Sequence, residues 1–181
     1  MEKFGVVIFF FVIMAFTSFS QEIPGFVFSE VIVVDSLDSG NLLKTGKEWV
    51  VENGFTSIDT SGLNEVKAEN SFFVYQKGLI SKQVHGKISY TFLLEVKNNK
   101  YKYTFSEFTF HYYKQNRNYE MKPTGKEKSL NDPTAKGWQK TWVQHKYSTK
   151  KDILLFIQSL KESLIPVIQP QVVKQSTPSD F

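Results

Sequence analysis

Two runs of alternating apolar and polar residues in the middle of the chain predict a β-hairpin. In residues 84–97 apolar side chains fill every second position, and mostly polar ones fill the positions between: Ile88, Tyr90, Phe92, Leu94 and Val96 form the apolar set. This period of two is typical of a strand with one dry and one wet face. A second alternating run covers residues 100–113, and Asn98-Asn99 between the runs tolerates the positive φ of a tight turn. We expect the other elements to be organised around this hairpin.

The second run changes phase in its middle. Its apolar residues occupy odd positions as far as Phe105 and even positions from Phe108 onward. One extra residue, a β-bulge, within one residue of Ser106 would return all the aromatic side chains to one face and bend the sheet. A regular ladder through residues 104–109 would contradict this prediction.

A strand and a helix are predicted before the hairpin. Residues Phe26–Val34 predict a strand inside the sheet, because apolar residues lie on both of its faces near its end. The chain then changes to a helical pattern that begins at the N-cap Asp38 and ends at Asn53-Gly54. A short strand at 55–58 and a longer one at 66–75 follow.

The last predicted element is a helix from Thr149 to Ile165. Thr149-Lys-Lys-Asp152 matches a capping box with Asp in place of the usual Glu. An apolar stripe with helical spacing follows, made of Ile153, Phe156, Ile157, Leu160 and Leu164. The elements together predict an α+β fold, a curved antiparallel sheet of four or five strands with two helices packed on one face, in the order β-α-β-β-β(-β)-α.

The segment 114–146, between the hairpin and the last helix, predicts a long, irregular basic loop. It is polar and contains Pro123 and Pro133, and ten basic residues oppose three acidic ones between positions 114 and 151. Loops of this length usually carry function or are disordered. Trp138, Lys140 and Trp142 alternate, so an extended segment would present both indoles on one side.

The two ends of the chain carry different patterns from the middle. Residues 1–20 read as a signal peptide, with Lys3 near the start, an apolar run too short to span a membrane, and Ser18-Phe19-Ser20 before the expected cleavage. Residues 21–165 then form a single domain, and residues 166–181 a flexible tail. We expect an exported, soluble mature protein. The leader does not distinguish a periplasmic from an extracellular location.

Composition excludes some chemistry without indicating a particular activity. The 181 residues contain no cysteine, which excludes disulfides, thiolate metal sites and cysteine nucleophiles. The net charge of +4 favours an anionic partner only slightly. Aromatic residues make up 15% of the chain, which favours sheet.

Particular residues give the chain a family resemblance. FSEVIVVDSL, then Gly46-Lys47-Glu48-Trp49, then GKISYTFLLEVKNNKYKYTFSEFTF and the closing helix resemble the domain of unknown function 4468 family, secreted bacterial proteins with a TATA-binding-protein-like fold. The resemblance spans roughly Phe26 to Ile165. It implies a curved sheet with both helices on one face and an envelope or secreted setting in Bacteroidota-type bacteria. It implies no activity.

The likeness of fold name does not predict nucleic-acid binding. Nucleic-acid sheets of that kind expose aromatic or apolar side chains on the open face. Here the aromatic side chains share the face that the helices need, and the open face would show hydroxyl and charged groups: Ser89, Thr91, Glu95, Lys97, Lys102 and Thr104.

The search for chemistry gives no recognised catalytic motif. The three histidines, His85, His111 and His145, lack metal-ligand spacing, and His111 fits a surface position. A carboxylate pair of Glu107 with Glu95 is conceivable in principle, but isolated carboxylates on solvent-facing strands are ordinary. The hairpin's serines and threonines fit solvent-facing positions better than nucleophiles. We expect no metal and no cofactor.

The leading hypothesis is therefore a non-catalytic exported binding module that contacts an anionic glycan, another envelope component or an acidic protein through the 114–146 segment. Its candidate ligand residues are Arg117, Trp138, Lys140 and Trp142. The competing interpretation of the tryptophans is that they plug the end of the core.

The alternative function is an envelope hydrolase or other enzyme with its site under the same segment. A lipid or small-molecule carrier is a third hypothesis, disfavoured by the bulky inward-pointing aromatics. Ligand and oligomeric state stay open.

Overall fold

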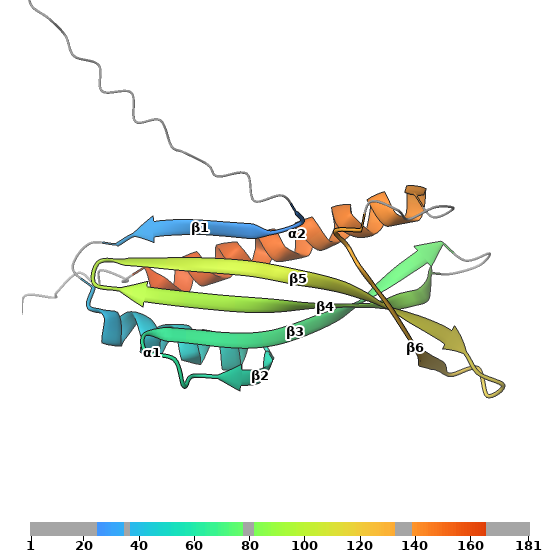
Figure 1. The fold of residues 1–181 in the computed structure, drawn as a ribbon, viewed down its shortest axis with the longest axis horizontal. Helices are drawn as coiled ribbons and strands as arrows, with labels where there is room; N and C mark the ends of the chain where they lie inside the picture. The colour runs from blue at the N-terminus through green and yellow to red at the C-terminus, as the bar shows by residue number, and fades with distance from the viewer. Residues whose placement is uncertain (1–24, 35–36, 78–81, 133–138, 166–181) are drawn as a thin grey trace, which may run out of the picture.

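The structure is a computed structural model that describes residues 25–34, 37–77, 82–132 and 139–165. Its elements are β1 (Phe28–Val33), α1 (Ser39–Glu52), β2 (Thr56–Asp59), β3 (Glu65–Lys77), β4 (Lys82–Lys97), β5 (Lys100–Gln115), β6 (Met121–Ser129) and α2 (Gln139–Leu164). The strands form one antiparallel sheet in the order β1-β5-β4-β3-β2, with β6 also paired to β5. Both helices lie behind this sheet in the view of Figure 1, so the opposite face is open. The predicted α+β fold is confirmed, with six strands in place of four or five.

The hairpin and its bulge are confirmed. β4 and β5 are joined by Asn98-Asn99, and Asn99 has a φ of 59°. Thr91 pairs with Ser106 but Ser89 pairs with Thr109, so two steps along β4 match three along β5. The extra residue is Glu107, whose φ is 58°. It restores the phase of the strand, and Phe105 and Phe108 are both fully buried on the helix side.

The prediction that the first strand lies inside the sheet is wrong. β1 pairs with β5 alone, from Phe28 opposite Phe105 to Val33 opposite Lys100, while β6 pairs with the far half of β5. β1 is therefore an edge strand, and its Val31 and Val33 side chains are 57% and 72% exposed. β-Branched residues suit any strand, so apolar residues on both faces do not by themselves indicate a central position.

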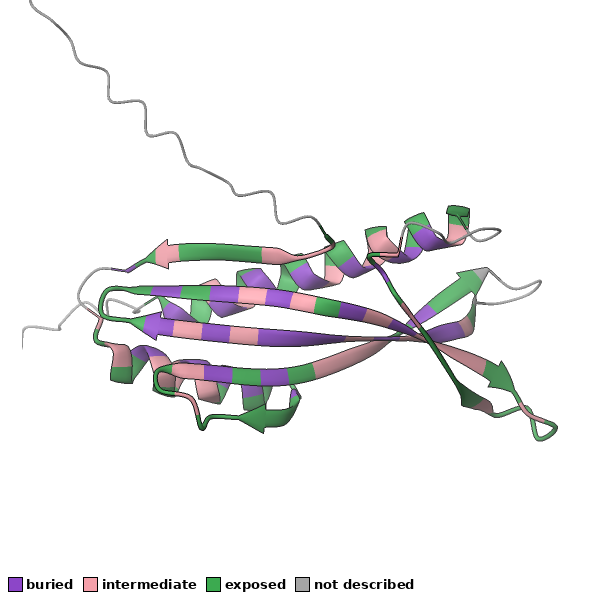
Figure 2. Ribbon diagram, viewed as in Figure 1, coloured by how far each residue is buried: buried purple, intermediate pink, exposed green. Residues whose placement is uncertain are grey.

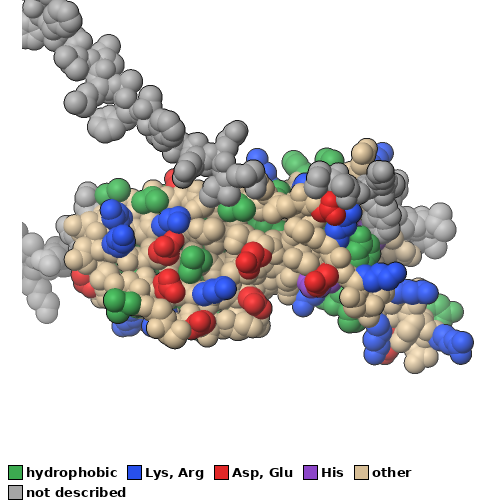
Figure 3. Space-filling view, in the orientation of Figure 1, with side chains coloured by type: hydrophobic (Ala, Val, Ile, Leu, Met, Phe, Trp, Pro, Cys, Tyr) green, Lys and Arg blue, Asp and Glu red, His purple; other side chains and the backbone are tan. Residues whose placement is uncertain are grey.

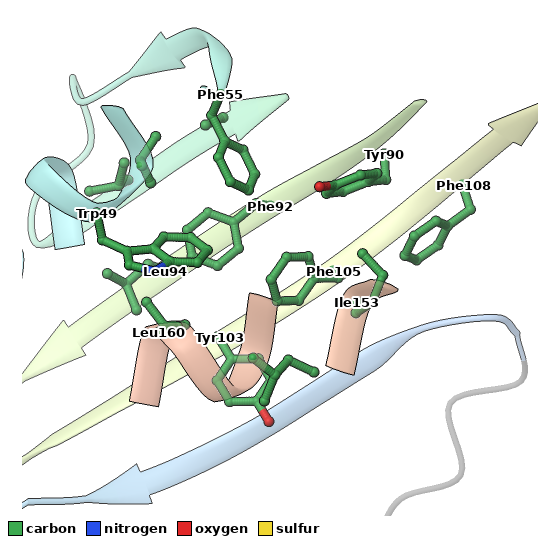
Figure 4. Packing of buried hydrophobic residues seen from close by; sticks show 14 of the residues in the cluster. Trp49, Phe55, Tyr90, Phe92, Leu94, Tyr103, Phe105, Phe108, Ile153 and Leu160 are labelled. Carbon is green, nitrogen blue, oxygen red and sulfur yellow. The ribbon is translucent and has the colours of Figure 1, made fainter. Parts of the chain in front are cut away.

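The core lies between the helices and the aromatic face of the sheet (Figure 4). Trp49 of α1 is 1% exposed and packs against Phe55 and Phe92, with ring centroids 5.4 and 5.3 Å apart. Its indole Nε1–H donates to Ser159 Oγ of α2 at 3.0 Å, which links the two helices. Figure 2 shows buried positions recurring along β4 and β5 between less buried ones, as the alternating sequence predicts.

The segment 114–146 is more ordered than its sequence predicts. It contains the end of β5, strand β6 and the first residues of α2, with the part between them (133–138) outside the described residues. Pro123 and Gly125 are tolerated in β6 because this strand lies at the edge of the sheet, where a missing amide donor or an irregular pairing leaves no central ladder broken.

The last helix begins ten residues earlier than predicted. Thr149 is fully buried in the interior of α2, so the proposed capping box is wrong. Trp142, His145 and Thr149 extend the apolar stripe toward the N-terminus at helical spacing, and all three are buried. The predicted signal peptide and C-terminal tail lie outside the described residues. Within the described part of the chain, neither helix combines the length and the hydropathy that crossing a membrane requires.

Candidate functional site

A basic arm projects from one end of the sheet. We use this name for residues 113–128, which comprise the end of β5, the turn after it and most of β6. Figure 1 shows these strands reaching away from the helices. The arm holds five basic and two acidic residues, and Figure 3 shows basic side chains gathered on it.

Two ion pairs neutralise part of this charge. Lys122 lies 3.2 Å from Glu120, and Lys128 lies 3.3 Å from Asp132. The side chains of Lys114, Arg117 and Lys126 are exposed, and so is the ring of Tyr119, at 83%.

The tip of the arm has a defined shape. Asn116 Oδ1 accepts hydrogen bonds from the backbone N–H groups of Asn118 and Glu120, both at 2.9 Å. Asn116 Nδ2 donates to Glu120 Oε2 at the same distance. An asparagine that closes a turn in this way fixes the backbone on either side of Arg117. The exposed guanidinium is therefore held at the tip by an ordered turn.

The four predicted ligand residues have different environments. Arg117 is at the arm tip, and Lys140 is exposed in the first turn of α2. Trp142 is only 5% exposed and packs against Phe110 at 5.6 Å between ring centroids. The expected extended segment with two presented indoles is wrong for Trp142, because the segment is helical there and its apolar face turns inward. The alternative, an indole that plugs the end of the core, describes Trp142 correctly. Trp138 lies outside the described residues.

A polar hollow of about 370 Å³ lies on the open face of the sheet at the bulge. Its lining combines hydroxyl, carboxylate and imidazole groups from four strands: Glu69, Ser89, Tyr90, Thr91, Glu107, Thr109, His111 and Glu127. Figure 3 shows histidine surface on this face, flanked by acidic and basic side chains. The hollow adjoins the base of the arm, since His111 and Glu127 are paired residues of β5 and β6.

Two short hydrogen bonds and one longer ionic contact connect side chains of the polar hollow. Ser89 Oγ lies 2.7 Å from His111 Nε2, and His111 Nδ1 lies 3.7 Å from Glu127 Oε2. Thr91 Oγ1 donates to Glu107 Oε2 at 2.6 Å. Glu107 thus has its own hydroxyl partner, whereas His111 stands between a hydroxyl and a second carboxylate.

Sequence reasoning found only part of this hollow. It considered His111 and Glu107 but assigned neither a catalytic role. Glu95, the other carboxylate considered with Glu107, bridges Lys102 at 3.0 Å. It missed the Ser89–His111 contact, which the hairpin register with its bulge implies. It also missed Glu127, because the sequence predicts a loop rather than a strand over residues 121–129. An expected strand there would have placed Glu127 beside His111 by antiparallel pairing.

The other two histidines form a buried pair. His85 Nδ1 of β4 lies 2.7 Å from His145 Nε2 of α2, and the His145 ring stacks on Phe110. Burial lowers the pKa of His145 to about 4, and burial also lowers the pKa of His85. Near neutral pH both rings are therefore uncharged, and one of them donates to the other. This contact joins the helix layer to the sheet.

No group of three or more metal-ligating side chains is found among the residues that the structure describes.

Comparisons with known proteins agree on the fold. A family model described as "Domain of unknown function (DUF4468) with TBP-like fold" matches residues 14–111, more than half of the chain. A solved TBP-like protein from Parabacteroides distasonis superposes with a TM-score of 0.59 at 9% identity, covering 80% of this chain and 95% of that one. A DUF4468 family protein from Bacteroides ovatus superposes with a TM-score of 0.54 at 11% identity, covering 80% and 89%. At these identities the likeness establishes the fold alone. The comparison with curated proteins finds no match.

Proposed function

Since the chain belongs to the family described as domain of unknown function (DUF4468) with TBP-like fold, we propose that it is an exported binding module whose basic arm contacts an anionic glycan of the cell envelope. The observation that carries this proposal is the net positive charge of the arm. Five of the 22 basic residues of the chain fall within these sixteen positions, against two of its 18 acidic residues.

The form of the arm supports contact with an extended polymer. Arg117 is held at an ordered tip, Lys114 and Lys126 are exposed, and Tyr119 offers an exposed ring. Guanidinium groups bind carboxylates and sulfates through paired hydrogen bonds, and aromatic rings pack against sugar faces. The leader-like residues 1–20 support an envelope setting.

The open face supports a glycan rather than nucleic acid as the partner. It carries Lys102 and Glu95 as an ion pair, together with hydroxyl groups. Phe73 and Tyr113 pack edge to face with ring centroids 5.6 Å apart, so these two rings do not form a flat platform on which successive bases stack. Binding by the arm itself requires no reaction.

The test is retention of the purified protein on immobilised heparin as a model sulfated glycan, measured at several salt concentrations. The arm variant is Lys114→Ala/Arg117→Ala/Lys126→Ala. At about 1 kcal/mol for each charge near an anionic surface, we expect its affinity at low salt to fall about 100-fold.

The matched control is Lys44→Ala/Lys97→Ala/Lys100→Ala, which removes the same charge from exposed sites outside the arm. Its affinity should stay within about 2-fold of wild type, because only the arm is expected to touch the glycan. Equal losses in both variants would show that net charge alone drives binding and would overturn the proposal.

A further inference from the structure

We propose that Ser89, His111 and Glu127 form a nucleophilic serine site that cleaves short-chain esters of polyhydroxylated alcohols, such as O-acetylated sugars. This activity goes beyond binding by the arm. It rests on the order of contacts within the polar hollow, where a hydroxyl, an imidazole and a carboxylate follow one another.

The contacts define the role of each nitrogen of His111. Nε2 lies 2.7 Å from Ser89 Oγ, a hydrogen-bond distance, and in the proposed site the imidazole accepts the hydroxyl proton. This requires the tautomer with its proton on Nδ1, and Glu127 Oε2 lies on that side at 3.7 Å. This distance is longer than a hydrogen bond, but catalytic hydrogen bonds are often longer in the absence of substrate, and a carboxylate on this side stabilises the imidazolium that forms.

The strand pairing places all three groups on the same face. Ser89 on β4 pairs with Thr109 on β5, and His111 follows two residues later on the same side. Glu127 on β6 is directly opposite His111. The hydroxyl of Thr91 holds the Glu107 carboxylate at 2.6 Å, so Glu107 is engaged elsewhere. The groups are fixed by a paired sheet rather than by loops, which favours a preorganised site.

The charge around the polar hollow selects the substrate class. Glu69, Glu107 and Glu127 line it, and these carboxylates disfavour an anionic reacting group. Lys87 pairs with His111 in the β4–β5 register, and its ammonium lies over the Phe73 ring, 5.9 Å from the ring centroid, so stabilising a developing oxyanion would require this side chain to turn toward the hollow. The volume of about 370 Å³ suits a small acyl group, and the hydroxyl and carboxylate lining suits the hydroxyls of a sugar.

The reaction balances without a cofactor. Ser89 Oγ attacks the ester carbonyl as its proton passes to His111 Nε2, and the carbon–oxygen bond to the alcohol breaks as that alcohol takes the proton from Nε2. Water then attacks the acyl carbon, its proton passes to Nε2, and the bond to Ser89 Oγ breaks as the serine recovers the proton. One ester and one water give one carboxylic acid and one alcohol.

The test uses 4-nitrophenyl acetate as the ester probe, with release of 4-nitrophenol and the mass of the acylated peptide as readouts. We expect a single acetyl group on the peptide that contains Ser89. Ser89→Ala should abolish this adduct, and His111→Gln should slow acylation at least about 100-fold. Glu127→Gln removes a positioning residue, so we expect kcat to fall at least about 10-fold while KM is unchanged.

Ser71→Ala is the matched control, because Ser71 pairs with Ser89 across β3 and β4 and should leave the rate unchanged. Circular dichroism of each variant establishes that it is folded. Acetyl groups on lysines alone, or equal rates for folded Ser89→Ala and wild type, would overturn the proposal. Heparin binding by the arm is measured separately, so either proposal can fail while the other holds.

Discussion

Acidification should weaken the fold through the buried histidine pair. The pKa of His145 is about 4 in the folded protein against an ordinary value of 6.5, because burial disfavours the charged ring. Between these two values the unfolded chain binds a proton that the folded chain does not, so stability falls as the pH falls. From pH 8 to pH 5 a single group with these two pKa values loses about 2 kcal/mol of unfolding free energy. His85, whose pKa is also lowered by burial, acts in the same direction.

The assay is urea denaturation at pH 8 and pH 5, followed by fluorescence of the buried tryptophans. The informative variant is His145→Gln, which removes the group but keeps a polar side chain near His85. It will be less stable at both pH values, so the quantity to compare is the pH-dependent loss. We expect that loss to be smaller by about 2 kcal/mol than in wild type.

Other groups do not obscure this comparison. Hydrogen bonds lower the pKa of Glu30, so its contribution is lost only at pH values below the window. Burial raises the pKa of Asp152, which favours the folded state as pH falls, but the variant retains this residue. His111→Gln, on the open face, is the matched histidine control. If wild type and His145→Gln lose the same free energy between pH 8 and pH 5, the proposed role of the buried pair is wrong.

Three further predictions concern the sheet and its contact with α1. Gly46→Ala should destabilise the protein by about 1 kcal/mol, because the new Cβ would lie 2.2 Å from Leu94 Cδ2 and overpacking outweighs the gain in helix propensity. In a Leu94→Ala background the same change should stabilise the protein. Urea denaturation midpoints measure both effects. Deletion of Glu107 should lower the free energy of unfolding by about 3–6 kcal/mol, since Phe108 and Phe110 would turn to the open face. A deletion variant as stable as wild type would contradict the bulge assignment. Tyr103→Phe should cost less than about 1 kcal/mol in the same assay, because its partner Glu30 is half exposed.

The sequence predicts the central hairpin and its bulge well because both depend on local alternation. The phase change between Phe105 and Phe108 has only one economical explanation, and the structure confirms it. The sequence predicts the start of α2 too late, because Thr149 matches a capping residue and Trp142 and His145 lie in a mostly polar segment; only the helical spacing of these three residues indicates that the helix begins earlier. β6 was missed because Pro123 and Gly125 are usual signs of a turn, and only an edge position makes them acceptable in a strand.

The candidate sites were harder to predict than the fold because they combine residues far apart in the chain. His85 and His145 are separated by 60 positions and meet only when α2 packs on β4. The hairpin register places Ser89 close to His111, and this register could be derived from the predicted bulge. The position of Glu127 could not be derived, because it depends on β6, which the sequence does not predict. Arg117 was correctly placed on an exposed basic segment, because charge and turn residues are local signals.

The long strand β5 pairs with two different strands along the same edge, with β1 over its first half and with β6 over its second half. The Phe26 N–H donates to Asn131 Oδ1 and so links the residues just outside these two strands. Apart from this bond, either strand can separate from β5 without breaking the ladder hydrogen bonds of the other. A pulling force applied at the N-terminus would first break the β1–β5 hydrogen bonds and would leave the β5–β6 pairing of the arm intact. Amide hydrogen exchange should report this as two independent opening events, one for residues 100–105 and one for residues 109–115.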